Sequence, residues 1–152
     1  MHYMVLELRE ATVDQADYNQ FETMYKNFEY SEIEGQSFSR SEGVLKTQSD
    51  YTEYITEKGN ILFVELDGTV IGYAILAWYE DGGVRIHEFH IIKEYQRKGY
   101  GKKAVKKLIE LVKNEGFKWL ELMSFSIGTD CFWSACNFRY IGHDEQYEFH
   151  IK

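Results

Sequence analysis

The sequence contains no proline, only two cysteines and no long apolar run. Without proline, the ends of helices and strands must be set by glycine and by polar residues. Cys131 and Cys136 are not accompanied by a second pair of ligands, so we interpret them as packing thiols and expect no metal site. The longest apolar runs, such as residues 72–78, are too short to span a bilayer. The sequence therefore predicts a soluble globular protein that needs neither disulfides nor metal.

The first ten residues also lack a basic region followed by an apolar stretch and a cleavage site of small residues. We therefore expect no secretory signal and a cytoplasmic location. The 152 residues, 44% of them hydrophobic, suit one domain over residues 1–152. A chain of this size buries about two thirds of its unfolded surface in a single core. No repeat, linker or second domain is visible.

Charge is distributed unevenly along the chain. The net charge is −8, but residues 96–118 carry eight cations against two glutamates, which makes this segment +6 and the remainder −14. An acidic protein disfavours nucleic acid as a partner, and we expect no membrane partner. The basic segment could hold a compact anion, whereas the alternative interpretation is a solvated helix face.

Hydrophobic periodicity and turn signals define the expected elements. Asp-Gly pairs separate three apolar runs, which is a strong signal for antiparallel hairpins. The expected elements are a strand near 5–8, a helix over 12–30, a loop over 31–43, a short helix within 45–59, strands at 61–66, 69–80 and 84–92, a helix over 101–115, a strand at 117–125, a short helix at 128–137 and one or two strands within 138–152. This order predicts an α/β fold in which helices flank a mixed sheet.

The helix expected over 101–115 has the strongest pattern. Its apolar residues recur at helical spacing, and they are Val105, Leu108, Ile109 and Val112. Lysines occupy the opposite face, and Gly116 is placed to end the helix. With the strands before and after it, this helix predicts a right-handed parallel crossover over residues 84–125.

A glycine-rich, cationic loop leads into this helix. The N-terminus of a helix exposes four unpaired amide groups and a partial positive charge, so it binds phosphate where the backbone can come close. Gly99 and Gly101 remove the Cβ atoms that would block this approach, while Arg97, Lys98 and Lys102 add positive charge. The loop therefore predicts a site for pyrophosphate.

The same loop resembles the acetyl-coenzyme A signature of the GNAT acyltransferases, Arg/Gln-x-x-Gly-x-Gly/Ala, with Gln96, Gly99 and Gly101 at its fixed positions. The order of the expected elements is also similar to that family over nearly the whole chain. The resemblance implies a GNAT fold, with a mostly antiparallel, twisted sheet flanked by helices, and acetyl-CoA as co-substrate. The residues implied to contact the coenzyme are Phe89, His90 and Ile91 at the pantetheine arm, and Gln96, Arg97, Lys98, Gly99, Tyr100, Gly101 and Lys102 at the pyrophosphate.

Residues 99–104 also fit the dinucleotide fingerprint Gly-x-Gly-x-x-Gly/Ala. Three observations count against this interpretation. The polar residues 93–98 separate the strand from the first glycine, whereas the dinucleotide turn follows its strand closely. Only 36 residues follow Gly116, too few for the remaining strand-helix units, and the preceding strands are antiparallel hairpins.

Acyl transfer from a thioester to an amine needs a base, a polarised carbonyl and an acid for the leaving thiolate. Glu88 is the only carboxylate on its strand and lies beside the residues expected to hold the pantetheine. We therefore predict Glu88 as the general base, acting directly or through water, with His87 as the alternative.

Two positions depart from the pattern of the GNAT family. Trp133 stands where family members often carry a tyrosine that hydrogen-bonds the coenzyme sulfur, and an indole cannot deliver a proton to a thiolate at neutral pH. Ser126 stands where many members have an asparagine that contacts the pantetheine. We count both among the coenzyme-binding residues. Either another tyrosine, such as Tyr140, acts as the acid, or the thiolate leaves without one.

The resemblance therefore implies an acetyl-CoA-dependent N-acetyltransferase that acts on a primary amine. Because the chain outside the basic segment carries −14, we expect a cationic small molecule or peptide as the acceptor. The acidic residues expected to attract it are Glu29, Glu32, Glu34, Asp144 and Glu145. Two alternatives stay open: a non-catalytic coenzyme A binding or sensing module of the same fold, and a structural domain whose basic helix meets an acidic partner. Exposed closing strands could also support a homodimer.

Overall fold

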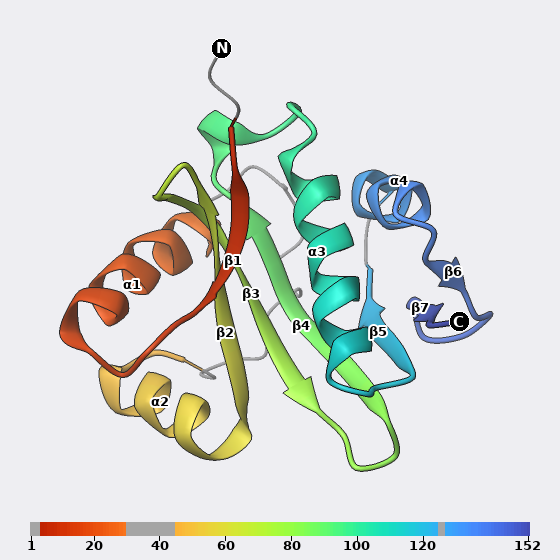
Figure 1. Ribbon diagram of the computed structural model, residues 1–152, viewed down its shortest axis with the longest axis horizontal. Coiled ribbons are helices and arrows are strands. Elements are labelled where there is room, and N and C mark those ends of the chain that lie inside the picture. The colour runs from red at the N-terminus through yellow and green to blue at the C-terminus, as the bar shows by residue number, and fades with distance from the viewer. Residues whose placement is uncertain (1–3, 30–44, 125–126) are drawn as a thin grey trace.

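A computed structural model describes residues 4–29, 45–124 and 127–152 (Figure 1). In chain order the elements are β1 (Leu6–Glu10), α1 (Gln15–Glu29), α2 (Gln48–Glu53), the π-helical turn η1 (Tyr54–Lys58), β2 (Gly59–Leu66), β3 (Thr69–Trp78), β4 (Gly83–Ile91), the 3-10 turn η2 (Lys93–Tyr95), α3 (Tyr100–Asn114), β5 (Trp119–Met123), α4 (Ile127–Ala135), β6 (Arg139–Tyr140) and β7 (Gln146–His150). This order confirms the predicted α/β fold, and the closing segment forms two strands. In the described part of the chain, no helix is both long and apolar enough to cross a membrane.

The described strands form one seven-stranded sheet in the order β1-β2-β3-β4-β5-β7-β6. Every neighbouring pair is antiparallel except β4 and β5, which are parallel. These two strands precede and follow α3 in the chain, as the crossover prediction requires. The turn between β2 and β3 contains only Asp67 and Gly68, with φ angles of 50° and 82°. Two positive φ angles define the type I′ turn that Asp-Gly favours, so the hairpin prediction is confirmed.

The two faces of the sheet carry different hydrophobic clusters. Along β3, Tyr73 and Ile75 pack with α1 and α2, whereas Ala74 and Leu76 pack with α3. Figure 1 shows α1 and α2 on one side of the sheet and α3 on the other. Apolar side chains that alternate between two covered faces explain why β3 is a nearly continuous apolar run.

The helix α3 has the amphipathic pattern and the end predicted for it. Val105, Leu108 and Val112 are buried against the sheet. At its C-terminus the amide of Gly116 donates to the carbonyl of Lys113 at 3.0 Å, and the amide of Phe117 donates to the carbonyl of Val112 at 3.2 Å. These bonds form a Schellman motif, for which Gly116 adopts a φ of 86°.

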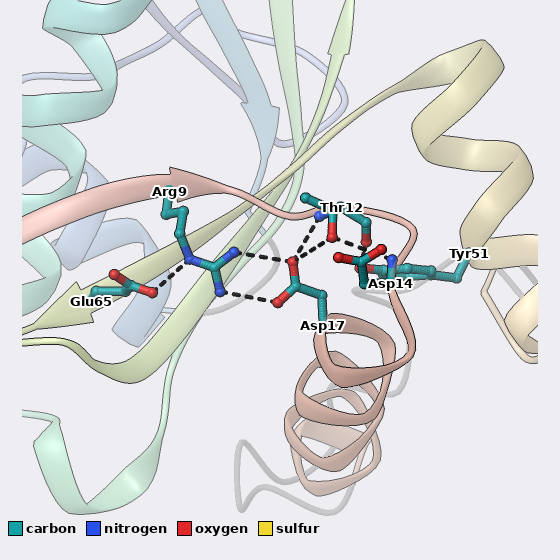
Figure 2. Close-up of polar contacts among 6 residues, drawn as sticks. All are labelled: Arg9, Thr12, Asp14, Asp17, Tyr51 and Glu65. Atoms are coloured by element: carbon teal, nitrogen blue, oxygen red, sulfur yellow. Dashed lines mark hydrogen bonds and ion pairs between the residues drawn. The ribbon is translucent and has the colours of Figure 1, made fainter.

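The start of α1 is fixed to the sheet by a polar network (Figure 2). Arg9 donates to Glu65 at 2.7 Å and to both carboxylate oxygens of Asp17 at 3.0 and 3.1 Å. Asp17 also accepts from the amide and the hydroxyl of Thr12, both at 2.9 Å, while the Tyr51 hydroxyl donates to the Thr12 carbonyl at 2.6 Å. Thr12 therefore takes part in the hydrogen bonds between the start of α1 and the sheet. The helix α1 begins at Gln15, three residues later than the sequence predicts.

Candidate functional site

Strands β4 and β5 pair over only a short distance and then separate. Their parallel pairing covers Gly83–Arg85 and Trp119–Glu121. At the last paired position, the Arg85 guanidinium lies 3.3 Å from the Glu121 carboxylate, an ion pair that joins the strands at the fork. On its other edge β5 pairs with β7 along its whole length, while the second half of β4 keeps only β3 as its partner among the described strands. One edge of β4 is thereby left open beside α3 and α4.

Aromatic side chains of α4 occupy part of the space at this open edge. The ring of Phe89 on β4 lies 5.9 Å from the ring of Phe132 and 5.7 Å from that of Trp133. Trp133 is 7% exposed and packs edge-on against both Phe132 and Phe138. Trp133, which stands at the position of the family's tyrosine, is therefore a core residue whose indole also contacts Phe89 at the edge of β4.

A cavity of about 500 Å³ lies at the open edge of β4. Its lining comes from β4, the loop before α3, the first turn of α3, and α4: Phe89, His90, Ile91, Gln96, Arg97, Gly99, Gly101, Lys102, Gly128, Thr129, Phe132 and Trp133. Most residues predicted to hold the coenzyme thus meet at one cavity. Of the other predicted residues, Lys98 and Tyr100 do not line the cavity, and Ser126 lies outside the described residues. Three residues that line the cavity were not predicted from the sequence: Gly128, Thr129 and Phe132.

The loop before α3 is closed by its own hydrogen bonds. The side-chain amide of Gln96 donates to the carbonyl of Ile91 at 2.6 Å, which ties the loop back to the end of β4. Gly99 is the N-cap of α3, with a φ of 86° that favours glycine. The first helical bond of α3 joins the amide of Lys103 to the carbonyl of Gly99 at 3.2 Å. The amides from Gly99 to Lys102 therefore have no acceptor within the helix, which suits an anion.

The absence of a side chain at Gly101 has a steric explanation that could not be predicted from the sequence. A Cβ atom at this position would lie 3.1 Å from Cε1 and 3.3 Å from Cζ of Phe132, and 3.6 Å from Cγ1 of Ile91. A Cβ at Gly99 would have no heavy atom within 4 Å. Hence Gly99 is required by its backbone angle, whereas Gly101 lets α3 and α4 approach each other beside the cavity.

Two predicted loop residues pack away from the cavity wall. The Lys98 ammonium lies 5.8 Å from the centre of the Tyr95 ring, a cation–π geometry. The Tyr100 ring lies 6.3 Å from that of Tyr95, and its hydroxyl lies 3.3 Å from the sulfur of Met4. Arg97 and Lys102 are the predicted cations that line the cavity.

The predicted base is turned by an irregularity in β4. Ile75 pairs with Glu88 and Leu76 pairs with Ile86, so His87 is an extra residue on the β4 side of the ladder. This bulge places Glu88 on the face of the sheet that carries α1 and α2, whereas Phe89 faces α3 and the cavity. Glu88 is 7% exposed and accepts a hydrogen bond from the hydroxyl of Tyr73.

Glu88 does not line the cavity, and neither do the two alternative catalytic residues, His87 and Tyr140. The side chain of His87 is exposed to solvent on one side. Partial burial of its ring, and then the positive charge of Arg85, lower the pKa of His87. Tyr140 lies on β6, is 56% exposed, and packs its ring 5.6 Å from that of Tyr147. The structure therefore does not bring Tyr140 to the position that an acid for the thiolate would need.

A polar cluster that the sequence did not predict fixes the start of α4. The hydroxyl of Ser124, a residue 3% exposed at the end of β5, donates to the Asp130 carboxylate at 2.6 Å and lies 2.7 Å from the hydroxyl of Thr129. Because a serine hydroxyl has one hydrogen, which goes to the carboxylate, the Thr129 hydroxyl donates to Ser124. This chain of bonds positions Thr129 at the cavity.

A parallel strand pair that opens beside the free amides of a helix N-terminus is the arrangement implied by the resemblance of the loop to the GNAT acyltransferase signature. The sequence model of the acetyltransferase (GNAT) family matches residues 21–133. The chain therefore belongs to the GNAT acetyltransferase family and is an acetyl-CoA-dependent acyltransferase. No curated protein matches the sequence.

Solved structures with the same fold span several bacteria. An acetyltransferase from Thermus thermophilus has a TM-score of 0.75 at 18% identity, over 99% of this chain and 100% of that one. A GNAT-family acetyltransferase from Staphylococcus aureus has a TM-score of 0.75 at 14% identity, over 97% and 100%. A GNAT-family acetyltransferase from Elizabethkingia anophelis, solved with acetyl-CoA bound, has a TM-score of 0.57 at 16% identity, over 69% and 84%. The GNAT fold predicted from the signature loop is thus confirmed.

Proposed function

We propose that this enzyme transfers acetyl from acetyl-CoA to a primary amine of a cationic small molecule or peptide, with Glu88 as the general base. The observation that carries the proposal is the cavity at the open edge of β4, where Phe89, the loop amides and Trp133 come together. On the other face of the same strand lies a buried carboxylate, one residue away from Phe89.

The cavity offers matching surfaces to the pyrophosphate and to the pantetheine arm of the coenzyme. The amides from Gly99 to Lys102, the positive end of α3 and the cations Arg97 and Lys102 suit the pyrophosphate. The open edge of β4 supplies backbone groups for the amides of the pantetheine arm. The rings of Phe132 and Trp133 give that arm an apolar wall.

The proposed transfer combines this cavity with the carboxylate of Glu88. A neutral amine nitrogen attacks the thioester carbonyl, the C–N bond forms, and the C–S bond breaks. The proton lost by the amine passes to Glu88, directly or through one water, and the sulfur leaves as a thiolate that takes up a proton from solvent. This last step needs no protein acid, which agrees with Trp133 at the cavity and Tyr140 outside it.

The cationic acceptor is inferred from charge. With the basic segment 96–118 set apart, the rest of the chain carries −14, which raises the local concentration of cations around it. Of the acidic residues named for steering, Asp144 and Glu145 lie exposed in the turn before β7, whereas Glu32 and Glu34 lie outside the described residues. The expected acceptors are amines with at least one further positive charge, such as polyamines, aminoglycosides or lysine-containing peptides.

The test is a kinetic screen of amines by thiol release from acetyl-CoA. Cationic amines should give a higher kcat/KM than neutral or acidic amines, and their advantage should shrink between about 20 and 150 mM salt, because the Debye length falls to about 8 Å. If glutamate or another acidic amine is the best acceptor without salt dependence, the charge argument is wrong. Tight coenzyme binding without turnover on any amine would instead favour a sensing module.

A further inference from the structure

The bulge in β4 gives Glu88 a specific partner on the neighbouring strand. Tyr73 lies on β3 opposite His90, and its side chain belongs to the same face of the sheet as Glu88. Tyr73 is completely buried, and its hydroxyl donates a hydrogen bond to Oε2 of Glu88. Regular alternation counted from Ile86 would place Glu88 on the face of α3, so the bulge allows Ile86 to face α3 while Glu88 faces Tyr73.

The ring of Tyr73 is held by aromatic neighbours from two other elements. From α1, the ring of Phe21 packs edge-on at 5.1 Å and that of Tyr25 lies at 6.4 Å. From β4, the ring of His90 lies at 5.7 Å. Because a packed ring keeps one rotamer, the hydroxyl of Tyr73 is a fixed point to which the carboxylate is bound.

We propose that Tyr73 is the positioning residue for the catalytic carboxylate of Glu88. The inference rests on the proposed function, in which Glu88 accepts the proton of the amine. A phenol that donates to the ionised carboxylate stabilises the charged form, which is the form that can accept a proton. It also occupies one carboxylate oxygen and thereby orients the other.

Other titratable groups around the pair must be separated from this effect. Tyr25 of α1, Tyr51 of α2 and Tyr54 of η1 belong to the same aromatic cluster. Burial raises the pKa of Tyr51 and of Tyr54, so both stay neutral over the pH range of catalysis. Nearer the pair lie the imidazoles of His87 and His90, and the Arg9–Asp17 ion pair lies at the start of α1. A measurement on the Glu88 carboxyl itself is therefore needed.

The experiment compares Tyr73→Phe with Tyr51→Phe as a matched control. Tyr51 is also fully buried in the aromatic cluster, but its hydroxyl donates to the backbone carbonyl of Thr12. Two quantities are measured: the pH profile of kcat/KM, and the titration of the Glu88 side-chain carboxyl by carbon-13 NMR. The NMR signal of Glu88 is assigned by its loss in Glu88→Gln.

Tyr73→Phe should move the acidic limb of kcat/KM and the carboxyl signal in the same direction, to higher pH, because a hydrogen bond to a charged group is lost. The rate below the limb should fall about tenfold, while the Kd of coenzyme A stays within twofold. Tyr51→Phe should move neither quantity. If Tyr73→Phe does not fold, fluorotyrosine at position 73, a stronger donor, should move both quantities to lower pH.

The possible failures can be told apart. If Glu88→Gln abolishes turnover but Tyr73→Phe leaves both the limb and the carboxyl titration unmoved, the role of Tyr73 is refuted and the base assignment stands. If Glu88→Gln keeps its rate within threefold, the base assignment is wrong, and the positioning role falls with it even where the carboxyl titration shifts.

Discussion

Gly101 offers a direct test of how the coenzyme cavity is built. In the structure, a Cβ at this position would lie 3.1 Å from Cε1 of Phe132, whereas carbon atoms in contact prefer about 3.5 to 4.0 Å. Gly101→Ala therefore forces the Phe132 ring away by roughly half an ångström, at a cost of about 0.5 to 1.5 kcal/mol for an off-rotamer side chain. Gly101→Val adds two methyl groups to this contact and should weaken coenzyme A binding by about 1 to 3 kcal/mol, which is roughly 5- to 150-fold in Kd.

The Phe132→Leu background separates the two possible reasons for a glycine here. If Gly101 is needed because α4 packs against it, removing the Phe132 ring relieves the clash. Gly101→Ala should then reduce coenzyme A affinity clearly less in the Phe132→Leu background than in the parent enzyme. Kd is measured by calorimetry, and folding is checked by the free energy of unfolding. An equal loss of affinity in both backgrounds would show that Gly101 serves only the approach of the ligand. Unchanged affinity in a folded Gly101→Val variant would remove the loop from the site.

Glu88→Gln should lower turnover by about two to four orders of magnitude at neutral pH while coenzyme A binding stays nearly constant, and steady-state kinetics with calorimetry test both points. Asp17→Asn removes the carboxylate that Arg9 binds, and it should lower the free energy of unfolding by about 1 kcal/mol at pH 7. Hydrogen bonds from Arg9, and then those from Thr12, hold the pKa of Asp17 below its ordinary value, against the opposing effect of burial. The stability difference between the parent and Asp17→Asn should therefore be full above about pH 4 and disappear as the pH falls through the folded-state pKa of Asp17. Thermal melts between about pH 2 and 7 measure it, and a difference that grows on acidification would contradict the assignment.

The features that could be predicted from the sequence are those determined by residues close together in the chain. The apolar residues of α3 recur at helical spacing, and Gly116 ends the helix in a Schellman motif. Asp67 and Gly68 specify a type I′ turn. The loop 96–102 carries a signature whose spacing identifies the family, because phosphate binding at a helix N-terminus depends on a few consecutive amides and on glycine between them.

The site itself depends on contacts between segments far apart in the chain. The partner of Glu88 is Tyr73, and the two share a face of the sheet in a register that shifts at the bulge between Ile86 and Glu88. Alternation counted from Ile86 would place Glu88 on the other face, alternation counted back from Phe89 gives the observed face, and no local pattern around residue 88 marks the extra residue. Strand register is decided by pairing with β3, so only the assembled sheet determines which way this carboxylate faces.

The cavity shows the same division. The sequence by itself determined the loop, its glycines and its cations, since these act through their own backbone and charge. Only the tertiary structure decided that β4 leaves β5 after Arg85, that Phe132 packs against Gly101, and that Tyr140 lies outside the cavity while Trp133 forms its wall. These features arise where β4, α3 and α4 pack together, because the volume between elements is set by all of their side chains at once and by no single stretch of the chain.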